Sequence, residues 1–155
     1  MSNKYRTHNC NELRKEHVNN NVVLSGWINK KRDHGNLLFI DLRDNYGITQ
    51  CIIDQDNLNF KKLEKTQLET VVRIEGKVVN RSPETINSEI STGEIEVTVE
   101  NFKVLGVCRE LPLPVFSDQE YAEDIRLKYR FLDLRRKKIH ENIILRSKVI
   151  SYIRN

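Results

Sequence analysis

VVLSGWINKKRDHGNLLFIDLRDNYGITQCIID, the stretch from Val22 to Asp54, decides the fold of this chain. Three runs rich in apolar and β-branched residues, at 22–32, 37–44 and 48–54, are separated by two short polar segments that each contain a glycine. Runs of this kind, joined by Asp-His-Gly-Asn and Asn-Tyr-Gly, are typical of β-strands linked by tight turns. The sequence therefore predicts a three-stranded antiparallel meander.

A helix and two further strands follow the meander. Residues 58–67 place Leu58 and Leu63 among lysines at helix-like spacing, and residues 71–80 and 94–105 again have the composition of strands. The predicted order is three strands, one helix and two strands. This is the order of an OB-fold, an all-β five-stranded Greek-key barrel with minor helical content. In such barrels the second and third strands, with neighbouring loops, form the ligand-binding face.

A proline-containing segment separates these strands from a basic C-terminal part. Leu111-Pro-Leu-Pro114 predicts an extended linker, because proline lacks an N–H donor and restricts the residue before it. We expect an OB domain over residues 1–107, a linker over 108–120 and a further segment over 121–155. Isoleucines recur at helical spacing in that segment, and no cap closes the helix, which suggests a fragment of a longer protein.

Composition and motifs exclude several functional classes. The 155 residues are 38% hydrophobic and 31% charged, which is typical of a soluble globular protein. No apolar run is long enough to span a membrane and no signal segment is visible, so we expect a cytoplasmic protein. The three cysteines lack the spacing of metal ligands, and we expect no bound metal. Phosphate-loop, nucleophile-elbow and zinc-helix motifs are also missing, which predicts no catalytic residues in this chain.

The net charge of +4 is unevenly distributed along the chain. Residues 1–32 contain seven Lys or Arg and two acids, residues 33–120 contain nine and sixteen, and residues 121–155 contain ten and four. A protein that holds nucleic acid by overall charge is usually basic throughout. Any nucleic-acid binding by this chain should therefore depend on a local basic patch and on contacts to base edges.

The predicted strands contain three candidate binding residues. Phe39 falls on the strand face opposite Leu38 and Ile40, so we expect an exposed ring on which a base can stack. Gln50 on the third strand and Glu96 on the fifth carry amide and carboxylate groups suited to base edges. The ordinary alternatives are a ring packed on a minor core and two solvated strand residues.

Several stretches together resemble bacterial-type aspartyl-tRNA synthetases. They are YRTHNC at 5–10, LSGWINKKRDHG at 24–35, FIDLRD at 39–44, TGEIEV at 92–97 and RLKYRFLDLRR at 126–136. Lysyl- and asparaginyl-tRNA synthetases share the N-terminal OB domain with this family. The Arg-Asp-His-Gly loop and the last of these stretches are similar to the aspartyl branch.

The resemblance implies that this chain is the N-terminal anticodon-binding fragment of a class II aspartate-tRNA ligase. The whole enzyme would use ATP and Mg²⁺ to attach L-aspartate to tRNA-Asp, and it would be a homodimer. Residues 121–155 would then be a hinge segment and the first helices of the catalytic domain. The fragment itself would need no cofactor. Whether tRNA-Asn is charged as well stays open.

The resemblance also implies roles for individual residues. Phe39 would stack on an anticodon base, Gln50 would read the central uridine, and Glu96 would read the first anticodon base. The residues that complete the cleft would be Arg32, Arg81 and Asn87. His34 would lie near the third anticodon base, and Glu84 stands where some relatives carry a basic side chain, so both bear on the choice between tRNA-Asp and tRNA-Asn.

Two other functions remain open from the sequence. A free-standing OB-fold module would bind single-stranded DNA or RNA with little sequence preference, whereas an anticodon-binding domain should prefer a stem-loop that contains GUC. A protein-interaction domain that uses the helix at 139–155 would dimerise and ignore RNA.

Overall fold

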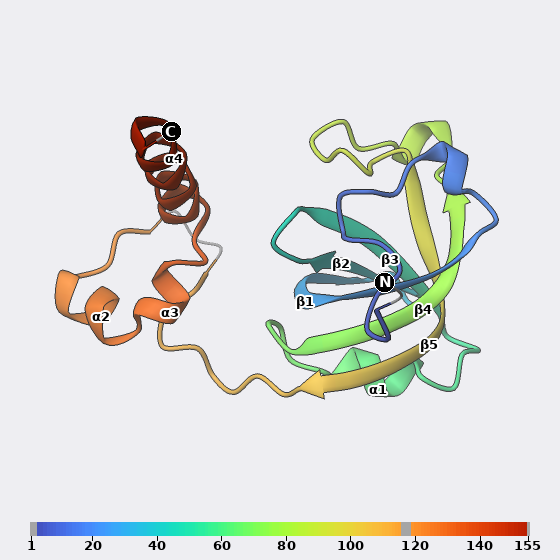
Figure 1. Cartoon of the computed structure of the whole chain (residues 1–155). Helices are drawn as coiled ribbons and strands as arrows, with labels where there is room; N and C mark the ends of the chain where they lie inside the picture. The colour runs from blue at the N-terminus through green and yellow to red at the C-terminus, as the bar shows by residue number, and fades with distance from the viewer. Residues whose placement is uncertain (1–2, 116–118, 155) are drawn as a thin grey trace. The chain divides into compact units, whose positions relative to one another are not determined.

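The chain forms two compact units, residues 1–109 and 110–155 (Figure 1). A computed structural model describes residues 3–115 and 119–154. The first unit contains five strands, one α-helix and two 3₁₀ turns. These elements are η1 (Lys15–His17), β1 (Asn21–Asp33), β2 (Leu37–Arg43), β3 (Ile48–Asp54), α1 (Phe60–Lys65), β4 (Val71–Asn80), η2 (Pro83–Thr85) and β5 (Ile95–Gly106).

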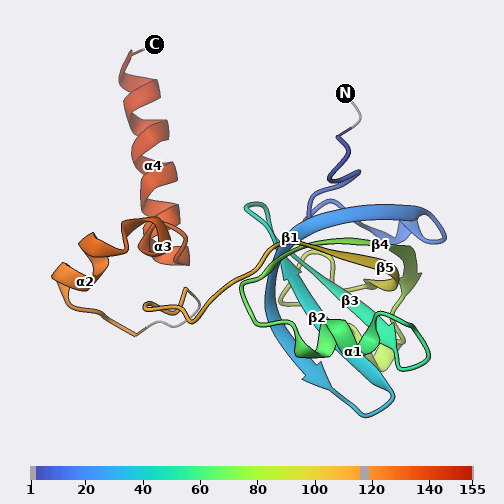
Figure 2. The same ribbon diagram turned by 90° about the horizontal axis from the view of Figure 1, so that it is seen from below.

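The five strands form a closed barrel in the order β1-β2-β3-β5-β4, with β4 pairing back onto β1 (Figure 2). All pairs are antiparallel except β3 with β5. This arrangement confirms the predicted OB-fold. The predicted helix was too long, because Leu58 lies before α1 and is 99% exposed, while Phe60 and Leu63 supply the buried face of the helix.

Alternate residues of the strands fill the barrel interior. In β1 every second residue from Val22 to Ile28 is buried, and β2 buries Leu38, Ile40 and Leu42 in the same way. Burial of each such side chain contributes about 1.5 to 3 kcal/mol relative to exposure. The residues between them face outward, and on β2 and β5 they include the polar side chains of Asp41 and Glu96.

A β-bulge in β1 determines which of its residues share that outer surface. The pairing of β1 with β2 shifts between Ile28 and Lys30, so that Lys31 is paired with the buried Ile40 and Arg32 with Phe39. A bulge inserts one extra residue and thereby exchanges the faces of the residues that follow. The bulge therefore places Arg32 on the same face as Phe39.

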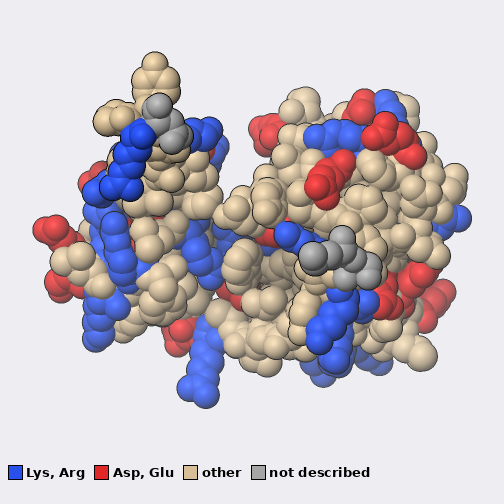
Figure 3. All heavy atoms as spheres, in the orientation of Figure 1, with Lys and Arg blue, Asp and Glu red and all other residues tan. Residues whose placement is uncertain are grey.

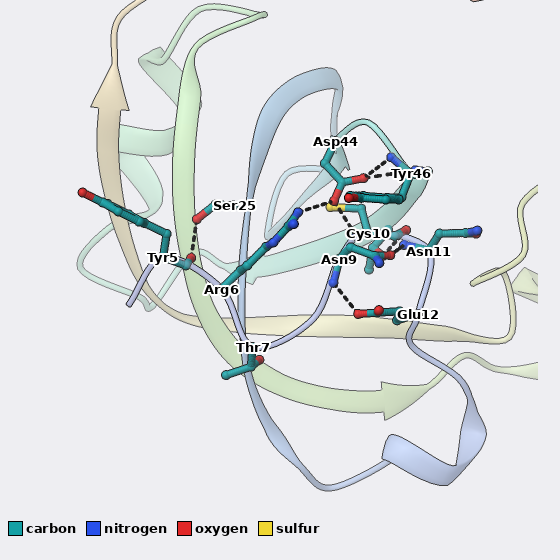
Figure 4. Close-up of polar contacts among 12 residues, drawn as sticks. Tyr5, Arg6, Thr7, Asn9, Cys10, Asn11, Glu12, Ser25, Asp44 and Tyr46 are labelled. Carbon is teal, nitrogen blue, oxygen red and sulfur yellow. Dashed lines mark hydrogen bonds and ion pairs between the residues drawn. The ribbon is translucent and has the colours of Figure 1, made fainter. Parts of the chain in front are cut away.

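Asp44, in the turn between β2 and β3, binds Arg6 and Cys10 of the N-terminal segment (Figure 4). The Asp44 carboxylate accepts hydrogen bonds from the backbone N–H of Cys10 at 2.9 Å and of Tyr46 at 2.7 Å, and it lies 3.5 Å from the Arg6 guanidinium. Thr49 donates to the Cys10 carbonyl at 2.9 Å. These contacts bury Cys10 in the core and fix the connection that enters β3.

The second unit is helical. It contains α2 (Glu123–Lys128), α3 (Arg130–Asp133) and α4 (Lys137–Arg154). The carboxylate of Asp133 is fully buried and lies within 2.7 to 3.6 Å of the guanidinium groups of Arg126, Arg130 and Arg136. Figure 3 shows Lys and Arg side chains spread over the visible face of this unit, as the basic composition predicts.

Helix α4 buries none of its described side chains. Its isoleucines at 143, 150 and 153 are 43%, 39% and 76% exposed, so the helical spacing read from the sequence produces a face that nothing in the described residues covers. Among residues 3–115 and 119–154, no helix combines the length and the apolar character needed to cross a bilayer.

Candidate nucleic-acid interface

Three polar residues from three strands form a row on the outer face of the barrel. Asp41 on β2 is paired with Gln50 on β3, and the parallel pairing of Cys51 with Val97 places Gln50 beside Glu96 on β5. Side chains that are neighbours across strands and share a face lie within about 5.5 Å of one another at Cβ. Strand pairing thus collects a carboxylate, an amide and a second carboxylate in one line.

A chain of hydrogen bonds runs along this row. Arg32 Nη2 donates to Asp41 Oδ1 at 2.8 Å and to Gln50 Oε1 at 3.0 Å. Gln50 Nε2 donates to Glu96 Oε2 at 2.8 Å, and the same carboxylate oxygen lies 4.0 Å from Arg81 Nε. Four of the residues that the resemblance implied, Arg32, Gln50, Arg81 and Glu96, are therefore in direct contact, and Asp41 joins them.

Phe39 is half-buried, not exposed as strand alternation predicted. The ring of His34 lies edge to face with it, with centroids 5.2 Å apart and ring planes at 82°. Ile52 is paired with Phe39 across β2 and β3. The predicted exposure of the Phe39 ring was too high, because the prediction considered one strand alone. His34, in the loop before β2, covers part of the ring.

The loop that carries His34 has a defined backbone. His34 N–H donates to Leu37 O at 2.9 Å, and Gly35 N–H donates to the Asp33 side chain at 2.8 Å. Gly35 has φ of 78°, which favours glycine because a Cβ is strained there. The tight turn therefore holds the exposed His34 ring against Phe39.

Arg81 does not line an open groove, because its side chain is only 3% exposed. Its Nε donates to Ile95 O at 2.9 Å and its Nη1 to Thr85 O at 3.3 Å, but the buried Nη2 has no hydrogen-bond partner. Burial lowers the pKa of Arg81, and the charges of Glu96 and Asp41 oppose that shift. A buried donor without a partner is costly to the folded state.

Asn87 and Glu84 lie in the loop between β4 and β5. Asn87 donates its backbone N–H to Gly93 O at 3.1 Å and accepts at Oδ1 from Glu89 N–H at 2.9 Å, so its side chain shapes the loop. Glu84 is exposed within η2. Within residues 3–115 and 119–154, no hydrogen bond or ion pair joins either side chain to the row of Asp41, Gln50 and Glu96.

Lys31 is engaged away from this face. Its ammonium group donates to the backbone oxygens of Glu64 at 2.6 Å and Thr66 at 2.5 Å, where it caps the C-terminal end of α1. Burial lowers the pKa of Lys31, and the charge of Glu64 opposes the shift. The exposed Lys30 and the partly exposed Arg32 remain as the cations of β1 nearest to the row.

Sequence reasoning did not single out Asp41. The signal was available, because Asp41 follows Phe39 by two residues in β2 and therefore shares its face. Its pairing with Gln50 required the register of β2 on β3, which the tight turn at Asn45-Tyr46-Gly47 defines. Among the described residues, no group of His, Cys, Asp and Glu side chains is arranged to hold a metal ion.

The segment that forms the barrel matches a known family. Residues 22–105 match the family described as OB-fold nucleic acid binding domain, which contains tRNA anticodon-binding domains. The chain belongs to this family. The OB-fold match spans β1 to β5 and includes every residue of the row.

Known proteins with this OB-fold domain include tRNA ligases. The chain is 74% identical to an aspartate-tRNA(Asp/Asn) ligase of Pelagibacter ubique over 99% of its own length and 26% of the relative. It is 58% identical to the ligase of the same name from Parvibaculum lavamentivorans, over 97% of the chain and 25% of the relative. The chain thus spans about a quarter of the length of these relatives.

The chain is also similar in structure to a solved tRNA synthetase. An asparaginyl-tRNA synthetase from Pyrococcus horikoshii, complexed with asparaginyl-adenylate, superimposes with a TM-score of 0.80 and 26% identity, over 95% of this chain and 33% of that one. The similarity therefore includes the OB-fold barrel and most of the remaining residues.

Proposed function

We propose that the barrel recognises the anticodon of a tRNA and is the anticodon-binding domain of an aspartate-tRNA ligase. The observation that carries the proposal is the row of Asp41, Gln50 and Glu96 next to Phe39, on the face that OB-folds use for single-stranded nucleic acid. An aromatic ring beside donors and acceptors of fixed position can bind one base by stacking and identify another by its edge.

Each residue has a role in this proposal. Phe39 stacks on an anticodon base, Gln50 reads the central uridine, and Glu96 accepts from the first base. Arg81 completes the cleft from beside Glu96, whose carboxylate lies 4.0 Å from its Nε. Arg32 and Asn87 line the cleft, Asn87 through the loop that it shapes.

The activity of the whole protein is part of the same proposal. Relatives that share 74% and 58% identity with the chain are named as aspartate-tRNA(Asp/Asn) ligases, which supports attachment of L-aspartate with ATP and Mg²⁺. A cytoplasmic homodimer in which residues 121–155 begin the catalytic domain is consistent with them. The chemistry of aminoacylation belongs to the remainder of such a protein.

The presence of His34 supports recognition of both tRNA-Asp and tRNA-Asn. The anticodons GUC and GUU differ at the third base, where cytosine presents an amino donor and uracil a carbonyl acceptor. A neutral imidazole has one donor and one acceptor nitrogen, so it can satisfy either base. Glu84, exposed in the other loop, adds no cation that would favour one of them.

Binding of anticodon stem-loops to the 155-residue chain tests the proposal. We expect GUC and GUU loops to bind within about tenfold of each other, a difference below about 1.4 kcal/mol, and a scrambled loop to bind more weakly. Equal binding of all loops and of unstructured oligonucleotides would instead identify a generic single-strand module. Dimerisation without RNA binding would favour a protein-interaction domain.

A further inference from the structure

The side-chain amide of Gln50 lies between two charged groups of opposite sign. Its Oε1 receives a hydrogen bond from the Arg32 guanidinium at 3.0 Å, and its Nε2 donates one to the Glu96 carboxylate at 2.8 Å. A guanidinium only donates and an ionised carboxylate only accepts. Rotation of the amide by 180° would therefore lose both hydrogen bonds and bring like partial charges together.

Each flanking group is held in turn by a partner of opposite charge. Asp41 Oδ1 accepts from Arg32 Nη2 at 2.8 Å, and Arg81 Nε lies 4.0 Å from the Glu96 carboxylate. Gln50 itself is only 7% exposed, so water competes poorly for its amide. In this low-dielectric position the two charge-assisted hydrogen bonds are stronger than neutral ones.

The held amide retains one free hydrogen and one free lone pair. Its oxygen has two lone pairs and its nitrogen two hydrogens, and the contacts above use one of each. The remaining pair can form two hydrogen bonds with the edge of one base. Uracil presents a donor at N3 beside an acceptor at O4, whereas cytosine presents an acceptor at N3 beside a donor at N4.

An amide that can turn over would match either pyrimidine. In one orientation of the amide its oxygen faces N3 of the base and its nitrogen faces the group at position 4, which suits uracil. In the flipped orientation the oxygen and nitrogen change places, which suits cytosine. Discrimination between the two bases therefore requires that the orientation, or sense, of the amide be fixed. A bidentate contact of fixed sense discriminates against the wrong base on the order of tenfold to hundredfold.

We propose that Arg32 and Glu96 fix the sense of the Gln50 amide, and that Asp41, by holding Arg32, is a positioning residue for selection of uracil over cytosine at the central anticodon base. This inference rests on the proposed anticodon recognition. It adds Asp41 to the specificity determinants without requiring that Asp41 touch the RNA. Removal of Asp41 frees Arg32, whose side chain is 39% exposed, to leave Gln50 for solvent.

Stem-loops that contain GUC and GCC test the inference. For the unaltered chain we expect tighter binding of GUC by about tenfold to hundredfold. In Asp41→Ala the ratio of the affinities for GUC and GCC should fall by about threefold or more, chiefly because the freed amide can also bind cytosine and the affinity for GCC rises relative to that for GUC. Glu96→Gln, whose amide can face either atom of Gln50, should narrow it as well, and the double variant should narrow it further. Glu100→Ala, which removes an exposed carboxylate from β5, should leave the ratio unchanged.

NMR of the RNA-free chain provides a readout that a loss of folding would not imitate. The two Gln50 side-chain amide protons should exchange slowly with water in the unaltered chain, and should exchange faster in Asp41→Ala and in the milder Asp41→Asn. Thermal melting checks that each variant is folded.

Two different failures can be distinguished. If the unaltered chain binds the GUC loop no more tightly than a scrambled loop, the proposed function itself is wrong. If it prefers GUC, but folded Asp41→Ala and Asp41→Asn weaken GUC and GCC binding equally and leave the Gln50 amide protons unchanged, then Asp41 only adds to the structure and the inference is overturned.

Discussion

The rings of His34 and Phe39 meet edge to face, with 5.2 Å between their centroids and 82° between their planes. This contact joins the loop after β1 to the outer face of β2, and it limits the rotation of a ring on which a base would stack. An aromatic contact of this geometry contributes about 0.5 to 1.5 kcal/mol beyond the burial of area. The residue proposed to face the third anticodon base therefore also supports the stacking ring.

The contact predicts that the two residues are coupled in RNA binding. Phe39→Ala should weaken binding of a GUC stem-loop by about 1 to 3 kcal/mol, the usual contribution of a base stacked on an aromatic ring. His34→Ala should weaken it as well, and the double variant by about 0.5 to 1.5 kcal/mol less than the sum of the two. Titrations of the four proteins measure this coupling.

Thermal melting separates that coupling from an effect on folding. Because Phe39 is half-buried, its removal should also lower the melting temperature modestly. A large loss of stability with unchanged affinity of the folded fraction would show that Phe39 is a core residue. Strict additivity of the two substitutions would show that His34 does not support the ring.

The strands could be predicted from sequence because their signals are local. Alternating burial and the turn residues at Gly35 and Gly47 define β1, β2 and β3 within the stretch 22–54, and no observed strand end differs from the predicted one by more than one residue. The same alternation placed Glu96 on the face away from the core, where its side chain is 15% exposed, but it assigned no face to Gln50, which is buried.

Features that depend on contacts between elements were not predicted. The bulge in β1 moves Lys31 under α1 and leaves Arg32 beside Phe39, and neither outcome follows from the run Lys30-Lys31-Arg32 itself. The burial of Arg81 depends on the carbonyl group of Ile95, which lies fourteen residues further along the chain in β5, and on that of Thr85 in the loop between β4 and β5. The polar row forms because of the register between β2, β3 and β5, and this register could not be predicted from the sequence alone.

The position of Lys31 predicts a weak dependence of RNA binding on salt. With that side chain bound to α1, the cations of β1 that remain to meet phosphates near the row are Lys30 and Arg32. About three phosphate contacts to a single strand give a log-log slope of about −2. Titration of the stem-loop at several salt concentrations measures the slope, and Lys30→Ala should reduce its size by about 0.7. A slope near −7 would contradict this expectation.

Gly93 predicts a sensitive point in the loop between β4 and β5. A Cβ at this position would lie 1.6 Å from Asn87 O, a backbone clash that no side-chain movement relieves. Gly93→Ala should therefore destabilise the chain by about 1 to 3 kcal/mol and weaken RNA binding as the loop opens. Gly106→Ala is the matched control, because its Cβ would meet Val71 at 3.9 Å, an ordinary contact. Equal melting temperatures for the two variants would contradict the argument.

The buried thiols of Cys10 and Cys51 predict a loss of stability in alkaline solution. Burial raises the pKa of both above the ordinary value of 9.0, and the nearby carboxylates of Asp44 and Asp41 raise it further. Because the unfolded thiols ionise first, each contributes a fall in the free energy of unfolding of about 1.4 kcal/mol per pH unit once the pH exceeds that ordinary value. Urea unfolding between pH 8 and about 10.5 measures this slope. Cys51→Ala should be less stable at every pH, from the cavity, but should have a slope shallower by one thiol's share. An unchanged slope in that variant would show that Cys51 ionises equally in both states.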